Sequence, residues 1–322
     1  MSRLTRNTLI TVKLETVPGT DATPTGTANA ILISEQSVTA VDAKNVDRAI
    51  VRGYMGASEQ LVGTVSKKVS FSVELAGSGT AGTAPALGPL LQACGMSEAL
   101  LTTPARVEYA PVSSGMKTAT IYYYDDGIVH KLVGARGTFT LSAKEGTIPK
   151  IKFEFTGLDG GDVVGTDTGN FAAFKKPVVM TKSNVTDISL GGTLSAGSVS
   201  GGQSCTSTGL ELQLGGSVNY VPTLSNESVD ITDRSGAGNV EFDLIAADEV
   251  TFINNVKANL TQSLAMTIGT VAGNRCQIYL PNVQLTNHKK IDQNGRRFIG
   301  FDLRVTPSAG GSGNDEIRLI FN

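Results

Sequence analysis

Few residues of this 322-residue chain have the types and spacing that catalysis requires. The two histidines, His130 and His288, are far apart, and neither lies in a serine or cysteine nucleophile motif. We expect both on the surface. Asp125-Asp126 resembles half of a catalytic acid pair, but the following Gly127 makes a hairpin turn the better interpretation. The sequence therefore predicts no enzyme and no catalytic residue.

The cysteines are equally dispersed. Because Cys94, Cys205 and Cys276 are widely spaced and odd in number, they predict neither a disulfide framework nor a zinc site. We interpret them as small apolar residues, with a reactive or paired thiol as the alternative. No phosphate-binding loop occurs, since the Gly77–Gly79 stretch is followed by no phosphate-binding lysine. No metal and no cofactor is expected.

Charge and hydropathy exclude further classes. The chain has 27 Lys and Arg against 29 Asp and Glu, a net charge of -2. Such a chain has no global attraction for phosphate, so it is not expected to be a dedicated nucleic-acid binder. The sequence contains neither an apolar run long enough to span a membrane nor a secretory h-region. We expect no membrane partner.

The run Tyr122-Tyr123-Tyr124 offers the main alternative function. Exposed tyrosines stack on sugars or bases, so this run could be the site of a β-sandwich adhesin or carbohydrate-binding module. Strand alternation places Tyr123 opposite the other two, however, which is typical of a strand that fills a core or an interface. A glycan-cleaving β enzyme would need two carboxylates at catalytic separation, and no convincing pair is present.

Alternation of apolar and polar residues predicts an all-β fold. In the segment Val65–Leu75, Val69, Phe71 and Val73 fall on one face, and Lys150–Thr156 alternates in the same way. A hairpin is predicted over Lys117–Leu141, with its turn at Asp125–Gly127. A short helix is predicted within Pro85–Cys94.

The same order of elements recurs in the second half. A strand at Val240–Leu244, a helix at Asp248–Leu260, a hairpin at Leu264–Leu285 and a strand at Arg297–Thr306 follow one another. The helix carries its apolar stripe on Val250, Ile253, Val256 and Leu260. The first matched strands of the two copies are offset by 171 residues (240 minus 69), and the last matched strands by 148 (299 minus 151). The difference predicts an insertion of about 23 residues in the first copy, which we place at Ala99–Met116.

We therefore predict two tandem β-sandwich domains with one short helix each, 1–175 and 176–322. The boundary is placed in the glycine-rich stretch Gly157–Lys176. A Gly/Ser-rich surface loop is predicted at Ser195–Ser207, and the segment Asp42–Gly63 has few core candidates and is interpreted as an exposed arm.

The Val65–Leu75 strand, its Gly/Ala/Thr-rich loop and the Pro85–Leu91 segment resemble the tail tube proteins of siphophages. The later hairpin and the Phe-x-Phe strand extend this resemblance over most of residues 1–175. The second half resembles a second tube domain, as in tail tube subunits whose duplicated domains let a trimer mimic a hexameric ring. A true hexamer, with only the first domain in the wall, is the alternative.

The resemblance implies sheets that join across subunits into a β-barrel channel, which conducts genomic DNA during ejection. Its implied partners are further copies of the chain, the tape-measure protein and DNA transiently in the lumen, and terminator and baseplate proteins at the ends. The protein would be made in the host cytoplasm and reside in the virion tail.

The resemblance also assigns candidate sites. The polar strand faces would form a net acidic lumen, with these candidates: Lys68, Ser70, Ser72, Glu74, Lys152, Glu154, Glu241, Asp243, Asp302 and Arg304. The segment Asp42–Gly63 would be the arm that contacts the next ring, with these candidates: Arg48, Arg52, Tyr54 and Met55.

Overall fold

The structure, a computed structural model, describes residues 3–308, 310–311 and 313–322. Residues 1, 2, 309 and 312 of the two predicted domains lie outside this description. The described residues form strands and three short helices, which confirms the all-β fold. The helices are α1 (Gly26–Asn29), α2 (Gly88–Ala93) and α3 (Ala246–Lys257).

One row of eight strands runs through both halves of the chain. Each strand is hydrogen-bonded to the next, and every pair is antiparallel. In order, the eight-strand row consists of β3 (Ser34–Asp47), β4 (Gln60–Glu74), β9 (Lys150–Val164), β8 (Ile128–Lys144), β14 (Ser207–Gln213), β17 (Ala237–Phe242), β20 (Arg296–Val305) and β19 (Cys276–Gln293).

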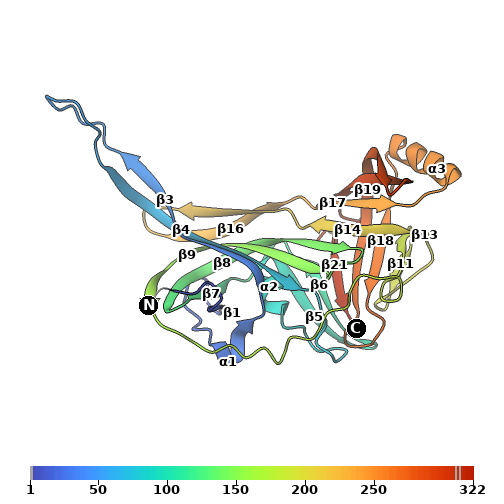
Figure 1. The fold of residues 1–322 in the computed structure, drawn as a ribbon, viewed down its shortest axis with the longest axis horizontal. Coiled ribbons are helices and arrows are strands. Elements are labelled where there is room, and N and C mark those ends of the chain that lie inside the picture. Colours follow the sequence, from blue (N-terminus) through green and yellow to red (C-terminus); the bar gives the residue numbers. More distant parts are fainter. Residues whose placement is uncertain (1–2, 309, 312) are drawn as a thin grey trace.

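The sheet continues from this row into a second layer, which lies beneath β8, β9 and β14 in Figure 1. On the first-half side it contains β1 (Thr8–Leu14), β2 (Ala30–Ile31) and β7 (Ala119–Asp125). On the second-half side it contains β10 (Ile188–Leu190), β13 (Gln203–Cys205) and β18 (Thr261–Ile268). The hairpin of β5 (Met96–Thr102) and β6 (Ala105–Pro111) comes from the first half but pairs with the second, because β6 is hydrogen-bonded to β21 (Arg318–Phe321).

Two hairpins stand apart from this sheet. One is formed by β11 (Thr193–Ser195) and β12 (Ser198–Ser200), and it occupies part of the segment predicted as a loop at Ser195–Ser207. That prediction was wrong, since β13 follows directly and pairs with β10. The other hairpin, β15 (Gly216–Pro222) with β16 (Glu227–Arg234), extends from β14 and β17 over the first half (Figure 1).

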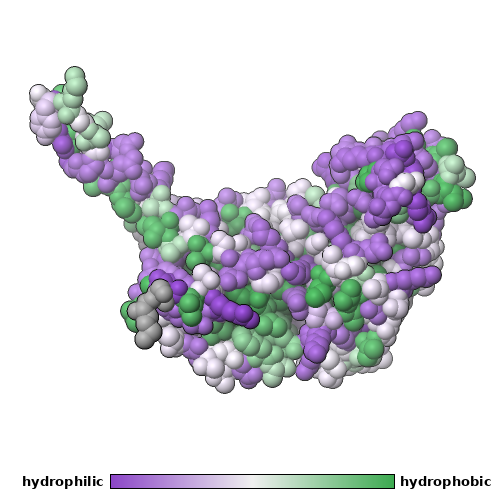
Figure 2. All heavy atoms as spheres, in the orientation of Figure 1, coloured by the Kyte–Doolittle hydropathy of each residue, from purple (hydrophilic) through white to green (hydrophobic). Residues whose placement is uncertain are grey.

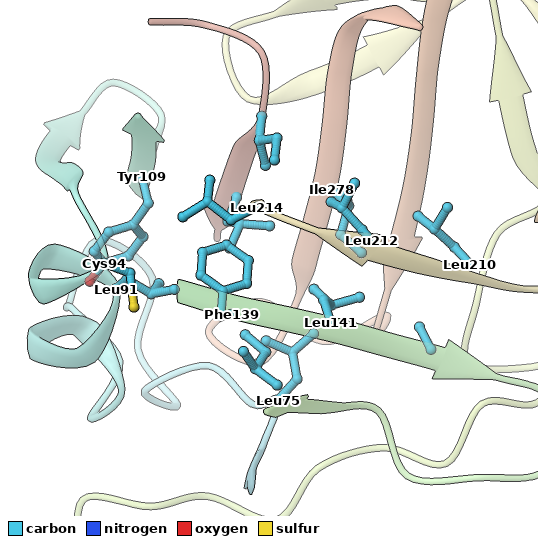
Figure 3. Close-up of a cluster of buried hydrophobic side chains, with 14 of the residues drawn as sticks. Leu75, Leu91, Cys94, Tyr109, Phe139, Leu141, Leu210, Leu212, Leu214 and Ile278 are labelled. Carbon is cyan, nitrogen blue, oxygen red and sulfur yellow. The ribbon is translucent and has the colours of Figure 1, made fainter. Parts of the chain in front are cut away.

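A single hydrophobic core lies between the layers and spans both halves. Figure 3 shows Phe139 and Leu141 of β8 gathered with Leu210 and Leu212 of β14, and with Ile278 of β19. Their side chains are all at most 1 % exposed. Because β8 and β14 are also hydrogen-bonded neighbours, the halves share both a sheet and a core.

The predicted strands and hairpins are present. Val69, Phe71 and Val73 are buried as the alternation predicted, and Asp125–Gly127 forms the turn between β7 and β8. The predicted insertion at Ala99–Met116 corresponds to the β5–β6 hairpin. Both predicted helices form. Helix α2 contains Pro89 in its first turn and is followed by Gly95 in the left-handed conformation that ends a helix.

Three details of the predictions were wrong. Helix α3 buries Phe252, whose ring packs on Phe242 and Phe301 with centroids 5.7 and 5.8 Å apart, while Ile253 and Val256 of the predicted stripe are half-buried. Val250 and Leu260 are exposed. The stretch expected to be irregular from Gly157 is strand as far as Val164.

The third detail is the register of the repeat. Phe71 pairs with Phe153, and its counterpart Phe242 pairs with Ile299, which gives an offset of 146 (299 minus 153) rather than 148. The two-residue difference preserves the face of each strand, so it could not be recognised from alternation.

The shared core leads to a stability prediction. Leu212→Ala should lower the free energy of unfolding by about 2–5 kcal/mol, because it opens a cavity between β8 and β14. The matched change Leu224→Ala removes a side chain that is fully exposed and should alter this energy by less than about 0.5 kcal/mol. Urea denaturation of the dilute subunit measures both. Equal effects of the two substitutions would contradict a core common to the halves.

Candidate functional site

The ten lumen candidates lie along one face of the eight-strand row, opposite the core. Directly paired residues of antiparallel strands project to the same side, so the face can be followed from strand to strand. One line of paired residues crosses six strands: Glu74, Lys150, Ser142, Glu211, Asn239 and Asp302. The line beside it does the same: Ser72, Lys152, Thr140, Gln213, Ala237 and Arg304. We call this surface the polar face.

The remaining candidates fit the same face with two local exceptions. Ser70 pairs with Glu154, Lys68 lies two residues away on β4, and Glu241 alternates with the buried Val240 and Phe242. Ser72 is buried, and its hydroxyl donates to the Glu35 carboxylate. Asp243 lies one residue beyond the end of β17, where it forms an ion pair with Arg296.

Most charges of the polar face are neutralised locally. Lys152 contacts Glu154 at 2.7 Å, Lys144 contacts Glu211 at 3.1 Å, and their exposed positions make these pairs weak individually. Hydrogen bonds from Lys289 and Asn287 lower the pKa of Asp302, so this carboxylate stays ionised near neutral pH. The ten candidates comprise three cations and five carboxylates, which sum to -2.

The β15–β16 hairpin covers part of the polar face on the first half. Arg136 of β8 donates to the Asp230 carboxylate and to the Val229 carbonyl oxygen, each at 2.5 Å. The Gly216 amide donates to the Thr138 hydroxyl at 3.1 Å. A cleft remains beneath the hairpin, lined by Lys68, Ser70, Glu154, Thr156 and Val218. This hairpin was missed by sequence reasoning, because its alternation is weak.

The four arm candidates lie at the tip of a long projecting hairpin. Strands β3 and β4 extend away from the body, and residues 48–59 connect them at the upper left of Figure 1. Arg48 and Arg52 both form ion pairs with Glu59. Val51 and Met55 are fully exposed and Tyr54 largely so, and Figure 2 shows further hydrophobic side chains along this arm. Exposed apolar residues gathered in this way indicate an interaction surface.

A charge cluster with one buried member, Lys67, lies on the core side of β4. Lys67 is fully buried, and its ammonium group contacts Asp159 at 2.7 Å and Asp162 at 2.6 Å. The Nδ1 atom of His130 lies 2.8 Å from the same Asp162 carboxylate. Sequence reasoning missed this cluster, although Lys67 shares the alternation of Val69 and Phe71.

Both histidines are half-buried, so they fit the prediction of surface histidines only in part. His130 is held by Asp162, and the ring of His288 packs edge-on against Phe301 beside Glu249. The cysteines are buried and unpaired. Burial raises the pKa of Cys276 to about 12 and helps raise that of Cys205 to about 11, which suppresses the reactive thiolate.

The tyrosine run belongs to the interior. Tyr122 and Tyr123 are buried, and the Tyr122 hydroxyl donates to Asp21. Among the described residues, no group of three or more His, Cys, Asp and Glu side chains could hold a metal ion. None of the helices they form has the length and hydropathy needed to cross a membrane. The surface features that remain are the polar face, the open strand edges and the arm.

An antiparallel sheet with an apolar inner side, a mixed-charge outer face and a projecting hairpin is typical of a structural protein. The chain belongs to the phage tail tube protein family, whose family model matches residues 5–319. No curated protein matches the sequence. The family makes the chain a structural tail tube subunit that self-associates into a stacked tube and forms part of the virion.

The Lys67 cluster predicts a pH dependence of stability. Burial alone would raise the pKa of Asp162, but hydrogen bonds from Lys67 and His130 leave it below its ordinary value. The stabilisation is therefore complete above the unfolded-state pKa of about 3.9 and is lost as pH falls through the lower folded-state pKa. Asp162→Asn should reduce the loss of stability between pH 6 and pH 3, as measured by urea denaturation.

Asp233→Asn, at an exposed position outside the cluster, is the matched control. A pH dependence that is the same in the Asp162 and Asp233 variants would show that the cluster does not contribute it.

Proposed function

We propose that this chain forms the wall of a siphophage tail tube, with three copies in each pseudo-hexameric ring. The observation that carries this proposal is the eight-strand row, in which four strands come from each half of the chain. Two tandem tube domains, 1–175 and 176–322, account for this arrangement. Among the described residues, the outer edge of β3 and the edge of β19 over residues 285–293 have no second strand partner, and closure across copies would cover both.

The dimensions suit a DNA conduit. Three rows of eight strands give about 24 strands, which at ~4.8 Å spacing and ~40° tilt make a circumference of roughly 150 Å. Side chains then leave a bore of roughly 40 Å. Duplex DNA passes through a channel of this width without being gripped.

The polar face is suited to line this bore. Its ten candidates carry a net charge of -2, which repels phosphate weakly, and the local ion pairs keep the field low. The lumen would hold the tape-measure protein before ejection and genomic DNA during it. Terminator and baseplate proteins would bind the ends of the tube. The subunit would be made in the host cytoplasm and have no enzymatic activity.

The arm is proposed to contact the next ring through Arg48, Arg52, Tyr54 and Met55. The exposed apolar residues at its tip support this role, because they gain burial only against another molecule. The alternative of an adhesin or carbohydrate-binding module loses its main support, since Tyr122 and Tyr123 are buried.

Electron microscopy tests the proposed assembly. Concentrated purified protein should show rings or tubes with a central hole in negative stain. The smallest ring should have about three times the 33.5 kDa mass of the subunit by native mass spectrometry. Monomers without a hole at high concentration would overturn the proposal, and a mass of six subunits would overturn the trimeric ring.

Proteolysis tests the arm. Trypsin should cut after Arg48 and Arg52 in the free subunit, because both lie in the exposed connection between β3 and β4. In assembled tubes the initial cleavage rate should fall at least tenfold, as measured by mass spectrometry of the fragments. Dissociation of the tubes should restore cleavage. Equal rates in the two states would contradict an arm buried by stacking.

A further inference from the structure

The chain contains a seam between its own halves. Strand β14 pairs with the end of β8, where Glu211 lies opposite Ser142 and Leu212 lies opposite Leu141. The same edge of β8 is occupied further back by β7, which ends its pairing at Ala135. One edge of β8 therefore pairs with two strands along its length, first with β7 and then with β14 of the other half.

Strand β19 occupies the position of β8 in the second half. One of its edges pairs with β18 from Cys276 to Gln284, as β8 pairs with β7. Beyond that point, residues 285–293 pair with β20 alone among the residues that the structure describes. The place that β14 takes on β8 is thus open on β19.

Strand β3 occupies the position of β14 in the first half. Val38 pairs with Val69 on β4, just as Leu210 pairs with Val240 on β17. Within the described chain β3 pairs only with β4, so its outer edge is open as well. The β14–β8 contact inside the chain therefore has two unpaired counterparts among the described residues. These are the outer edge of β3 at one end of the row and residues 285–293 of β19 at the other.

Strand β3 also exposes apolar residues that a neighbour would cover. Val41 and Val46 are more than half exposed. The charges near the two edges are largely paired within the chain, in these ion pairs: Glu35–Lys150, Asp42–Lys68, Lys289–Asp302 and Lys290–Glu249. The exposed valines, rather than net charge, therefore favour coverage of the β3 edge by another copy.

We infer that β3 of one copy pairs antiparallel with residues 285–293 of β19 in the next copy, repeating between chains the β14–β8 seam found within each chain. This contact deepens the proposed tube-wall function and rests on it. Because it joins two different edges head to tail, each copy offers one of each and a ring can close. The polar face then continues from one copy to the next.

The repeat also supplies the register. Thr39 pairs with Lys68 and is the counterpart of Glu211 in the repeat. Glu211 lies opposite Ser142, and Ser142 pairs in turn with Lys150. At the offset of 146 that the structure shows, the counterpart of Lys150 is Arg296, which pairs with Gln293. Thr39 should therefore lie opposite Gln293 of the neighbouring copy.

Disulfide formation tests this register. Thr39→Cys protein is mixed in equal amounts with Gln293→Cys protein, assembled and oxidised. Paired residues of antiparallel strands lie within disulfide reach, so the mixture should yield covalent dimers in up to about half of the chains, the share expected when the two variants mix at random. The double variant carrying both cysteines in one chain should yield a closed covalent ring. The native cysteines are buried, and each single variant alone controls for them.

Ser142→Cys combined with Glu211→Cys is the matched positive control, because these residues already face each other within the chain. Tubes in which this control closes while the Thr39→Cys and Gln293→Cys mixture does not cross-link would overturn the inference and leave the proposed function intact. Absence of rings in the unmodified protein would instead overturn the proposed function, and the inference with it.

A second measurement needs no substitution. Hydrogen exchange of the unmodified protein should slow at least tenfold on assembly in residues 37–42 and 285–293, because new interstrand hydrogen bonds protect their amides. Unchanged exchange at both edges in assembled tubes would overturn the inference even if the cysteine variants fail to assemble.

Discussion

Hydrogen bonding at strand edges constrains the whole molecule. A strand edge without a neighbour exposes N–H and C=O groups that another strand can pair. Strand β14 of the second half covers part of such an edge in the first half, because it pairs with the end of β8. The seam brings Leu210 and Leu212 over the core that Phe139 and Leu141 begin. Among the described residues, the edges that stay without a partner are those of β3 and of β19 over residues 285–293, and these are the edges that the proposed assembly would cover.

Strand alternation then divides the row into two surfaces with different roles. Apolar residues on one side, such as Phe71, Phe153 and Phe242, have no freedom to vary without loss of the core. The opposite side can carry charge, and its lysines and carboxylates neutralise each other across neighbouring strands, as Lys144 and Glu211 do. The result is a long face that is hydrophilic and nearly neutral, a surface that attracts neither phosphate nor apolar segments strongly.

The sequence predicts those features that depend on local pattern. Period-two alternation placed Val69, Phe71 and Val73 in the core and assigned all the lumen candidates to one face, although Ser72 proved to be buried by Glu35. Alternation cannot predict which strands become neighbours, so the β14–β8 seam was not foreseen. It also cannot distinguish a slip of two residues, which is why the repeat offset was misjudged.

Two further errors have the same physical origin. Lys67 falls on the core side of β4, where a charge is buried only because Asp159 and Asp162 reach it from β9, a pairing set by tertiary structure. Helix α3 packs Phe252 rather than Val250 against the sheet, because the rings of Phe242 and Phe301 lie there. In both cases a side chain was positioned by partners distant in sequence. In the proposed wall, the contacts between copies would likewise be set by folded strands rather than by local pattern, and the β14–β8 pairing within the chain is the example from which they are inferred.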